Sequence, residues 1–242
     1  MSGHSKWHKV RQFKGAIDAK RAASFTRLAR EITVAAREKG SDPDMNTRLR
    51  AAITRAKEAS MPKDNIERAI TRGAGGGEEG EIETLTYEAY APGGTALIIE
   101  CLTDNRNRTA SDVKHMLTKN GATLAASGAV TYLFDHVGVV RIPEKVAQAN
   151  PLSPEVELAL IDSGATDIQN DEGAIEIHCD PKDLAQVADA TAQASLEADT
   201  VEFQWIPQTL IETNEEIGMA VAGLIEKLEE NDDVSRVFCN LA

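Results

Sequence analysis

A glycine-rich segment separates two different hydrophobic patterns in this chain. It reads Gly73-Ala-Gly-Gly-Gly-Glu-Glu-Gly80 and is typical of a linker, because glycine loses much conformational entropy when it is ordered. Before it, apolar residues recur at helical spacing, and after it they recur at the spacing of strands. The chain is therefore expected to begin with a helical domain, residues 1–78, and to continue as α+β structure.

Three helices are expected in the first part. One lies between Ser24, which suits an N-cap, and Gly40. A second begins at Asp42-Pro43, with Asp as the cap and Pro in the first turn, and a third ends at Gly73. Their apolar stripes would bury against one another, which predicts a bundle of the three-helix type.

Two ferredoxin-like α+β domains, one inserted in the other, are expected after the linker. Residues 135–206 follow the order β-α-β-β-α-β, which is that of the ferredoxin-like fold. The flanking segments 79–134 and 207–242 would form the domain that receives the insertion. The predicted fold class is therefore α+β with an N-terminal helical domain.

The flanking segments have their own signals. A hairpin is expected around Pro92-Gly-Gly94, and a helix capped by Asn105 or Asn107 follows it. Residues 129–134 read as another strand, and a last helix and strand lie near the carboxyl end.

Charge is distributed unevenly along the chain. The net charge is −13, yet residues 1–72 hold 17 Lys and Arg against 8 Asp and Glu, whereas residues 73–242 hold 9 against 31. A basic segment of this density suits phosphate groups, since ordinary surfaces mix the two signs. The first segment is therefore expected to bind nucleic acid, while the acidic remainder projects away and presents a surface to protein partners.

The candidate nucleic-acid-binding residues form two groups. The amino-terminal arm mixes cations with Trp7, which combines phosphate attraction with base stacking, although Trp7 could equally pack the arm onto the helices. Arginines spaced by four or seven residues would stack on one side of each helix and follow a phosphate backbone. The candidates are His4, Lys6, Trp7, His8, Lys9, Arg11 and Lys14 in the arm, and Arg30, Arg37, Arg48, Arg55, Arg68 and Arg72 on the helices.

A second candidate patch follows the hairpin. Arg106 and Arg108 lie at the start of the next helix and Lys114 and Lys119 lie further along it, in a region otherwise poor in cations. The alternative is a helix cap in which Asp104 pairs with an arginine inside the protein. The sequence leaves both interpretations open.

Catalytic and cofactor motifs are missing from the sequence. The histidines are scattered, without a G-x-S-x-G or an H-E-x-x-H pattern, and a formal G-x-G-x-x-G in the linker has no strand before it. The cysteines, Cys101, Cys179 and Cys239, are too far apart to suggest a zinc site and are expected to be buried, reduced thiols. We therefore expect a protein that is not an enzyme and that uses no cofactor and no metal.

The longest apolar runs fall far short of the roughly 20 residues that a bilayer crossing needs. The amino-terminal residues are polar and charged, unlike a secretion signal. The expected location is the cytoplasm, with no membrane partner.

Three segments resemble the YebC/PmpR family. They are Gly3-His-Ser-Lys-Trp7, Met61-Pro-Lys-Asp-Asn-Ile-Glu-Arg-Ala-Ile70, and Pro92-Gly-Gly-Thr95 continuing through Glu100-Cys-Leu-Thr-Asp-Asn-Arg-Asn-Arg-Thr109. The likeness reaches Asp232-Asp-Val and Val237-Phe238, so it covers essentially the whole chain. It implies an all-helical first domain, two α+β domains and binding to nucleic acid. Family members are regarded as probable transcriptional regulators and include a mitochondrial translational activator.

The expected function is therefore regulation of gene expression through nucleic acid. The resemblance implies either DNA-binding transcriptional control or ribosome-associated help in translating difficult sequences such as proline runs. The partners would be DNA, or ribosomal or transfer RNA, with the ribosome or the transcription machinery. No dimerisation heptad or recognition helix is visible, which favours RNA. The alternative is a non-catalytic protein-interaction module whose basic face binds an acidic protein.

Overall fold

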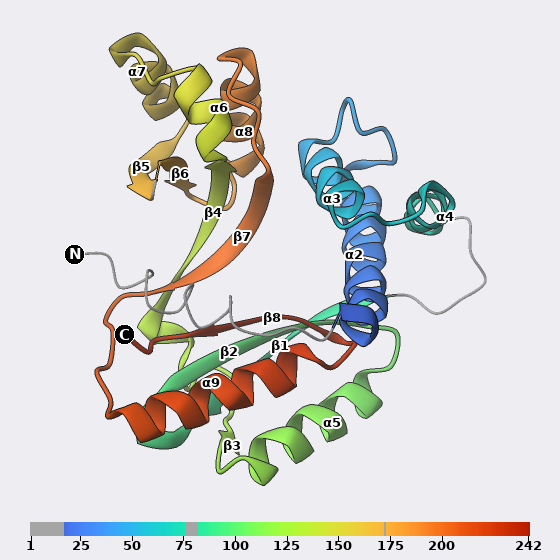
Figure 1. Ribbon diagram of the computed structural model, residues 1–242, viewed down its shortest axis with the longest axis vertical. Coiled ribbons are helices and arrows are strands. Elements are labelled where there is room, and N and C mark those ends of the chain that lie inside the picture. The colour runs from blue at the N-terminus through green and yellow to red at the C-terminus, as the bar shows by residue number, and fades with distance from the viewer. Residues whose placement is uncertain (1–16, 76–81, 172) are drawn as a thin grey trace. The chain divides into compact units, whose positions relative to one another are not determined.

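The computed structural model describes residues 17–75, 82–171 and 173–242. Within them the chain is α+β, with N-terminal helices followed by two four-stranded antiparallel sheets (Figure 1). The described residues divide into two compact units, one from 17–27, 82–135 and 205–242, the other from 28–75 and 136–204. The domain boundaries expected from the sequence, which set residues 1–78 apart, stay a prediction.

The N-terminal helices are α2 (Ile17–Lys39), α3 (Thr47–Glu58) and α4 (Lys63–Gly73). The expected start of the first helix was wrong, because α2 already runs through Ser24. The expected start of the second was also wrong. Asn46 caps α3 by accepting a hydrogen bond from the Leu49 amide at 3.0 Å, and its side-chain amide donates to the Ala35 and Gly40 carbonyls at 2.8 Å. These bonds place the cap four residues after Asp42.

Glycine is required where α4 closes against α2. A Cβ atom at Gly73 would lie 2.4 Å from the Thr33 carbonyl oxygen, which is closer than atoms can approach. The Thr33 hydroxyl donates to the Ala69 carbonyl at 3.1 Å in the same buried contact. Met61, Ile66 and Ala69 are all buried. Apolar side chains of the segment Met61–Ile70 therefore pack in the interior.

The first sheet has the order β3-β1-β2-β8, with antiparallel neighbours. The expected hairpin is confirmed, with Gly93 at a φ of 76° in the 3-10 turn Pro92–Gly94. Two helices pack on one face of this sheet, where Leu97 and Ile99 of the sheet contact Leu117 and Leu224 of the helices (Figure 1). The elements are β1 (Glu83–Tyr90), β2 (Ala96–Thr103), α5 (Arg106–Lys119), β3 (Thr123–Leu124), α9 (Glu215–Glu229) and β8 (Val234–Cys239).

The opposite face of this sheet is covered by an irregular segment, so the strand expected at 129–134 was wrong. The Glu88 carboxylate is buried there and accepts hydrogen bonds from the amides of Gly128, Val130 and Thr131, at 2.6, 2.7 and 2.9 Å. These amides are not available to a neighbouring strand, and a 3-10 turn (Thr131–Leu133) forms instead. Burial opposes ionisation of Glu88, but the three amides outweigh it, so the pKa of this carboxyl is lowered.

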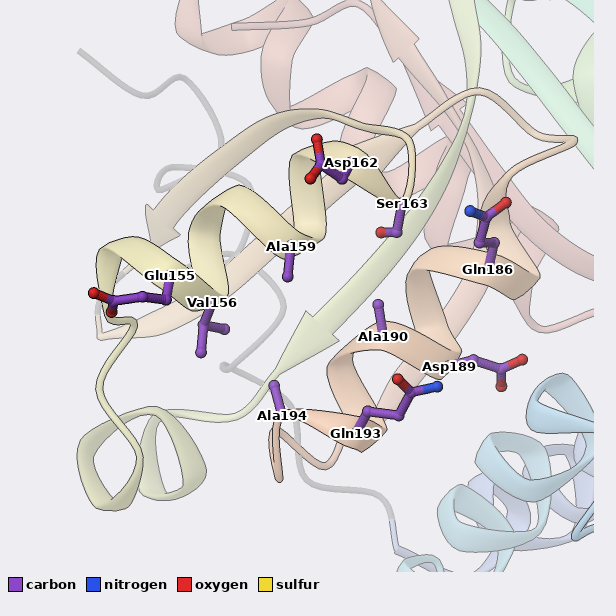
Figure 2. Close-up of a pocket in the computed structure, with 10 residues that line it drawn as sticks. All are labelled: Glu155, Val156, Ala159, Asp162, Ser163, Gln186, Asp189, Ala190, Gln193 and Ala194. Carbon is purple, nitrogen blue, oxygen red and sulfur yellow. The ribbon is translucent and has the colours of Figure 1, made fainter.

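The second sheet has the order β5-β6-β4-β7, which is the order of a ferredoxin-like β-α-β-β-α-β unit. The helix α6 (Glu144–Ala149), which the sequence pattern did not suggest, follows β4, the first strand of this sheet along the chain. Helices α7 and α8 lie side by side (Figure 2). The remaining elements are β4 (Phe134–Ile142), α7 (Pro154–Asp162), β5 (Ala165–Asp171), β6 (Ala174–Cys179), α8 (Leu184–Gln193) and β7 (Thr200–Pro207).

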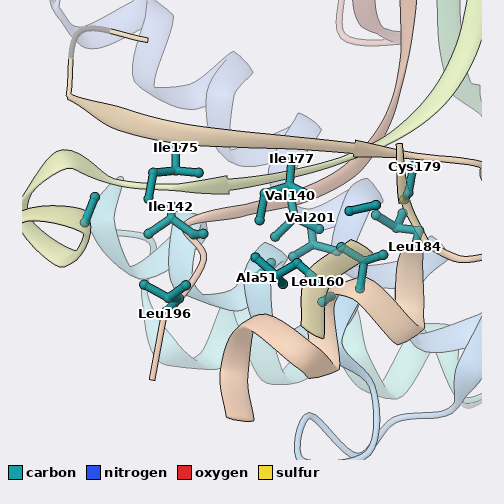
Figure 3. Packing of buried hydrophobic residues seen from close by; sticks show 14 residues of the cluster. Ala51, Val140, Ile142, Leu160, Ile175, Ile177, Cys179, Leu184, Leu196 and Val201 are labelled. Atoms are coloured by element: carbon teal, nitrogen blue, oxygen red, sulfur yellow. The ribbon is translucent and has the colours of Figure 1, made fainter. Parts of the chain in front are cut away.

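The core of the second unit lies between this sheet and its helices (Figure 3). Val140, Ile142 and Ile177 of the sheet are fully buried against Leu160 of α7 and its neighbours. Ala51 of α3 belongs to the same core, and α3 contacts α8 as well as α4. The expectation that the N-terminal helices bury only against one another was therefore wrong for α3.

Candidate nucleic-acid interface

The structure places only part of the candidate interface. The seven candidates of the arm lie outside the described residues: His4, Lys6, Trp7, His8, Lys9, Arg11 and Lys14. The six candidates on the helices are all described, and they fall into three kinds of environment.

Arg37 and Arg68 are exposed, on α2 and α4 respectively, whereas Arg30 and Arg72 are half-buried. Arg68 donates to the Asp64 carbonyl at 3.2 Å and to the Asn65 side chain, so its guanidinium lies along the first turn of its own helix. These contacts leave most of the Arg68 side chain in solvent.

Arg55 faces the interior of its unit. Its two terminal nitrogens donate to Glu31 of α2 and to Glu202 of β7, each at 2.6 Å, and only 20% of its side chain is exposed. Hydrogen bonds between a guanidinium and carboxylates are short and strong, because both partners are charged. Arg55 therefore ties α3 to α2 and to the second sheet.

Arg48, seven residues before Arg55 on the same helix, has a similar role. Its guanidinium pairs with Glu38 of α2, and its carbon Cζ lies 5.3 Å from the ring centroid of Phe203 of β7. That distance is within the range of a cation–π contact. The arginine column expected on α3 thus attaches this helix to its neighbours.

Four other cations on these helices are exposed, and the spacing of the arginines did not predict them: Lys39, Arg50, Lys57 and Lys63. Arg50 also donates to the Pro43 and Asp44 carbonyls, at 3.0 and 2.7 Å, and so holds the loop before α3. The excess of cations over acids in residues 25–75 does indicate such exposed cations, whatever their spacing. Residues 25–75 hold 11 Lys and Arg against 7 Asp and Glu.

The second candidate patch divides in the same way. Arg108 makes bonds of 2.8–3.1 Å to the buried Asp233 and one of 3.0 Å to Asp104, while Asn105 caps the helix. These hydrogen bonds, first those with Asp233, raise the pKa of the Arg108 guanidinium. The alternative of an internal pair with Asp104 is therefore what the structure shows for Arg108.

All four members of that patch are exposed on α5, although Arg108, with 45% of its side chain exposed, is bound to Asp233 and Asp104; the other three are Arg106, Lys114 and Lys119. The helix holds four cations against one acid, Asp112, whereas α9 beside it holds four acids against one lysine. The outward side of α5 is thus a cationic surface in an acidic unit.

The cysteines are free thiols, and two of the three are fully buried. Burial, with Asp183 and Asp180 nearby, raises the pKa of Cys179 to about 11. This thiol stays protonated at neutral pH and is not an activated nucleophile. Among the described residues no three His, Cys, Asp or Glu side chains gather as a metal site would need.

None of the helices in the described ranges combines the length and the apolar character that would let it cross a membrane.

The fold and the charged surfaces define a class: a multidomain α+β protein in which cationic helices precede two acidic sheet domains. The chain belongs to the TACO1/YebC family. The profile of its N-terminal domain matches residues 5–76, and that of its second and third domains matches residues 82–241.

Relatives and a solved structure agree with this assignment. A protein of Persephonella marina is 46% identical over 99% of this chain and 95% of its own length, and one of Roseiflexus castenholzii is 46% identical over 100% and 95%. Each bears the name probable transcriptional regulatory protein. The crystal structure of a conserved hypothetical protein from Aquifex aeolicus is similar, with a TM-score of 0.78 and 41% identity over 95% of this chain and 93% of that one.

Proposed function

We propose that this protein regulates gene expression by binding nucleic acid through the cationic face of its N-terminal helices and the arm before them. The observation that carries the proposal is the set of exposed cations on α2, α3 and α4, in a chain whose net charge is −13. The name that its relatives bear supports a regulatory role.

Phosphate binding follows from the placement of these cations. Lys and Arg that neutralise backbone phosphates release counterions, and this release supplies much of the affinity for nucleic acid at low salt. Arg37, Lys39 and Lys57 are exposed and suit this role, whereas Arg48 and Arg55 are engaged with carboxylates. The acidic remainder of the chain repels phosphate and so confines the contact.

The outward side of α5 is the second contact that we propose. Arg106, Lys114 and Lys119 would bind phosphates there, while Arg108 positions the start of the helix through Asp233. Because this surface is smaller than the first, its removal should weaken binding less.

Structured RNA suits the helical face better than a palindromic DNA site. On α4, the two outward cations Lys63 and Arg68 accompany two acids, Asp64 and Glu67, and Lys63 lies 3.3 Å from Glu67. On a helix inserted in a major groove, these two acids would lie close to the flanking phosphates and repel them. Contact with the backbone of a ribosomal or transfer RNA needs only the cations.

Two captures from one lysate test the proposal. The full chain is compared with the variant Arg37→Ala/Lys39→Ala/Lys57→Ala in co-sedimentation with ribosomes and in pull-down on promoter DNA. We expect capture by ribosomes that falls at least tenfold in the variant, since three phosphate contacts are lost. The matched control is Lys145→Ala/Lys182→Ala/Lys227→Ala, which removes three exposed cations outside both surfaces.

Equal losses in the two triple variants would contradict the proposal. Capture on promoter DNA alone would move the target to DNA. No capture of either nucleic acid would favour the alternative, a protein-interaction module whose basic face binds an acidic protein.

A further inference from the structure

An uncharged segment lies between α5 and β4. None of the 14 residues 121–134 is charged, in a chain of which 27% is charged. The segment contains β3, which forms one edge of the first sheet, and ends in the 3-10 turn Thr131–Leu133 and the first residue of β4 (Figure 1). Its small residues 126–128 are exposed. This surface therefore differs both from the cationic side of α5 and from the acidic remainder of the chain.

The 3-10 turn exposes an aromatic ring. Tyr132 is 67% exposed, whereas Val130 and Phe134, two residues to either side, are 0% and 4% exposed. In a strand these three side chains would share one face, because side chains alternate between the two faces, and Tyr132 would be buried with the other two. The exposure of Tyr132 thus follows from the conformation of the backbone.

Glu88 holds the conformation that exposes Tyr132. Besides the three amides that its carboxylate binds, its carbonyl accepts a hydrogen bond from the Ala125 amide at 2.8 Å. The Tyr90 hydroxyl donates to the Ala129 carbonyl at 2.8 Å, and this second tyrosine is 41% exposed. Rings carried by an ordered backbone lose little further freedom when they bind a ligand. Tyr90, Tyr132 and residues 126–128 are therefore a preorganised surface, the tyrosine surface.

Cations of α5 lie at the same edge of the sheet. Lys119 is the last residue of α5, and β3 begins four residues later at Thr123, which pairs with Tyr90. Helix α5 also contacts β3. Lys114 and Lys119 belong to the outward side of α5, the second contact of the proposed function. A strand held there by its phosphates would bring its bases to the tyrosine surface.

We propose that the tyrosine surface stacks an unpaired base of single-stranded RNA or of an RNA loop. Proteins bind unpaired bases by combining aromatic rings, which stack on the bases, with cations that bind the phosphates. The lack of charge in residues 121–134 suits the face of a base, which is itself uncharged. This inference rests on the proposed function and makes it more specific, because bases stacked within a duplex are not available to Tyr132.

The affinity of the full chain for two RNAs tests the proposal. One is an unstructured single strand of about 12 nucleotides, which lies in the size range of single-strand binding sites, and the other is a duplex of the same length. Tyr132→Ala should weaken binding of the single strand about fivefold or more, since a stacked base is lost, and should change binding of the duplex less than about twofold. Tyr132→Phe keeps the ring and should bind both RNAs as the unmodified chain does.

The salt dependence separates stacking from phosphate binding. Tyr132→Ala should leave the slope of log K against log[salt] unchanged, because a stacked base neutralises no phosphate. Lys114→Ala/Lys119→Ala should instead reduce the magnitude of the slope by about one to two units on both RNAs. Met219→Ala, which trims a side chain 64% exposed on α9, is the matched control and should change neither the affinity nor the slope.

Tyr132→Trp gives a direct signal of stacking. A base stacked on an indole quenches its fluorescence, so the single strand should quench this variant more than the unmodified chain, whose Trp7 and Trp205 give the baseline. The duplex should quench the two proteins alike.

Three results would overturn the proposal. Unchanged affinity of Tyr132→Ala for the single strand, with the salt dependence intact, would mean that RNA is bound through its phosphates alone, and the proposed function would stand. An equal loss on single strand and duplex would mean that Tyr132 does not read unpaired bases. Binding of neither RNA by the unmodified chain would contradict the proposed function as well, and the exposed tyrosines would then suit a protein partner.

Discussion

Helices α2 to α4 and the α7–α8 segment carry opposite charge on one chain. Residues 17–75 hold 13 cations and 8 acids, whereas residues 151–197 hold 1 cation and 11 acids. The first surface suits phosphate and the second excludes it. The net charge of −13 describes neither surface, so partners have to be inferred from each surface by itself.

The same comparison holds on a smaller scale among the arginines of the helices. Arg37 is exposed on α2, whereas Arg55 is held between Glu31 and Glu202. Both occupy positions that helical spacing alone assigns to an outward column. Their roles differ because α3 packs against a sheet that lies far away in the sequence.

Replacing Arg55 should have the largest effect on stability. Arg55→Ala leaves Glu31 and Glu202 without their cation, and loss of one partner from a shielded pair costs about 3 kcal/mol of unfolding free energy. Arg37→Ala should change the unfolding free energy by less than about 0.5 kcal/mol, which is typical of substitutions at exposed positions. Urea denaturation measures both, and equal effects would remove the distinction between structural and surface arginines.

A smaller effect is expected where the two surfaces meet. The Thr47 hydroxyl at the start of α3 donates to the Asp189 carboxylate of α8 at 2.9 Å. Thr47→Val removes this exposed hydrogen bond and should lower the unfolding free energy by about 1 kcal/mol. Thr54→Val, which removes a bond to the Arg50 carbonyl of the same helix, is the control. A loss equal to that of the control would mean that the bond to Asp189 contributes nothing.

The smallest effect concerns repulsion by the acidic segment. Glu157→Gln/Asp162→Asn/Glu197→Gln removes three exposed negative charges. In about 0.01 M salt, where the Debye length is about 30 Å, nucleic-acid binding should tighten roughly two- to threefold. In about 1 M salt the change should vanish. A gain that persists at high salt would point to a contact and would contradict long-range repulsion.

Local patterns predicted much of the fold. The hairpin at Pro92–Gly94, the Asn105 cap and the ferredoxin-like order of the second sheet follow from turn chemistry and from hydrophobic period, which act over a few residues. The strand expected at 129–134 failed because Glu88, some 40 residues earlier, takes up the amides of that segment. No local pattern contains that bond.

The candidate interface was predictable to a similar extent. The excess of cations in the first part of the chain can be counted from the sequence, and Arg37 and Arg68 are exposed as expected. The sequence could not show which arginines have internal partners. Asp233 is 125 residues from Arg108, and Glu202 is 147 residues from Arg55.

The salt dependence of nucleic-acid binding by the full chain tests the central claim most directly. If the arm and the helices neutralise about five phosphates, log K against log[salt] should have a slope near −3.5 on single strands or −4.5 on duplex. Lys6→Ala/Lys9→Ala/Arg11→Ala should reduce the magnitude of that slope by about two to three units if each residue neutralises one phosphate. A flat salt profile on both DNA and RNA would contradict the account.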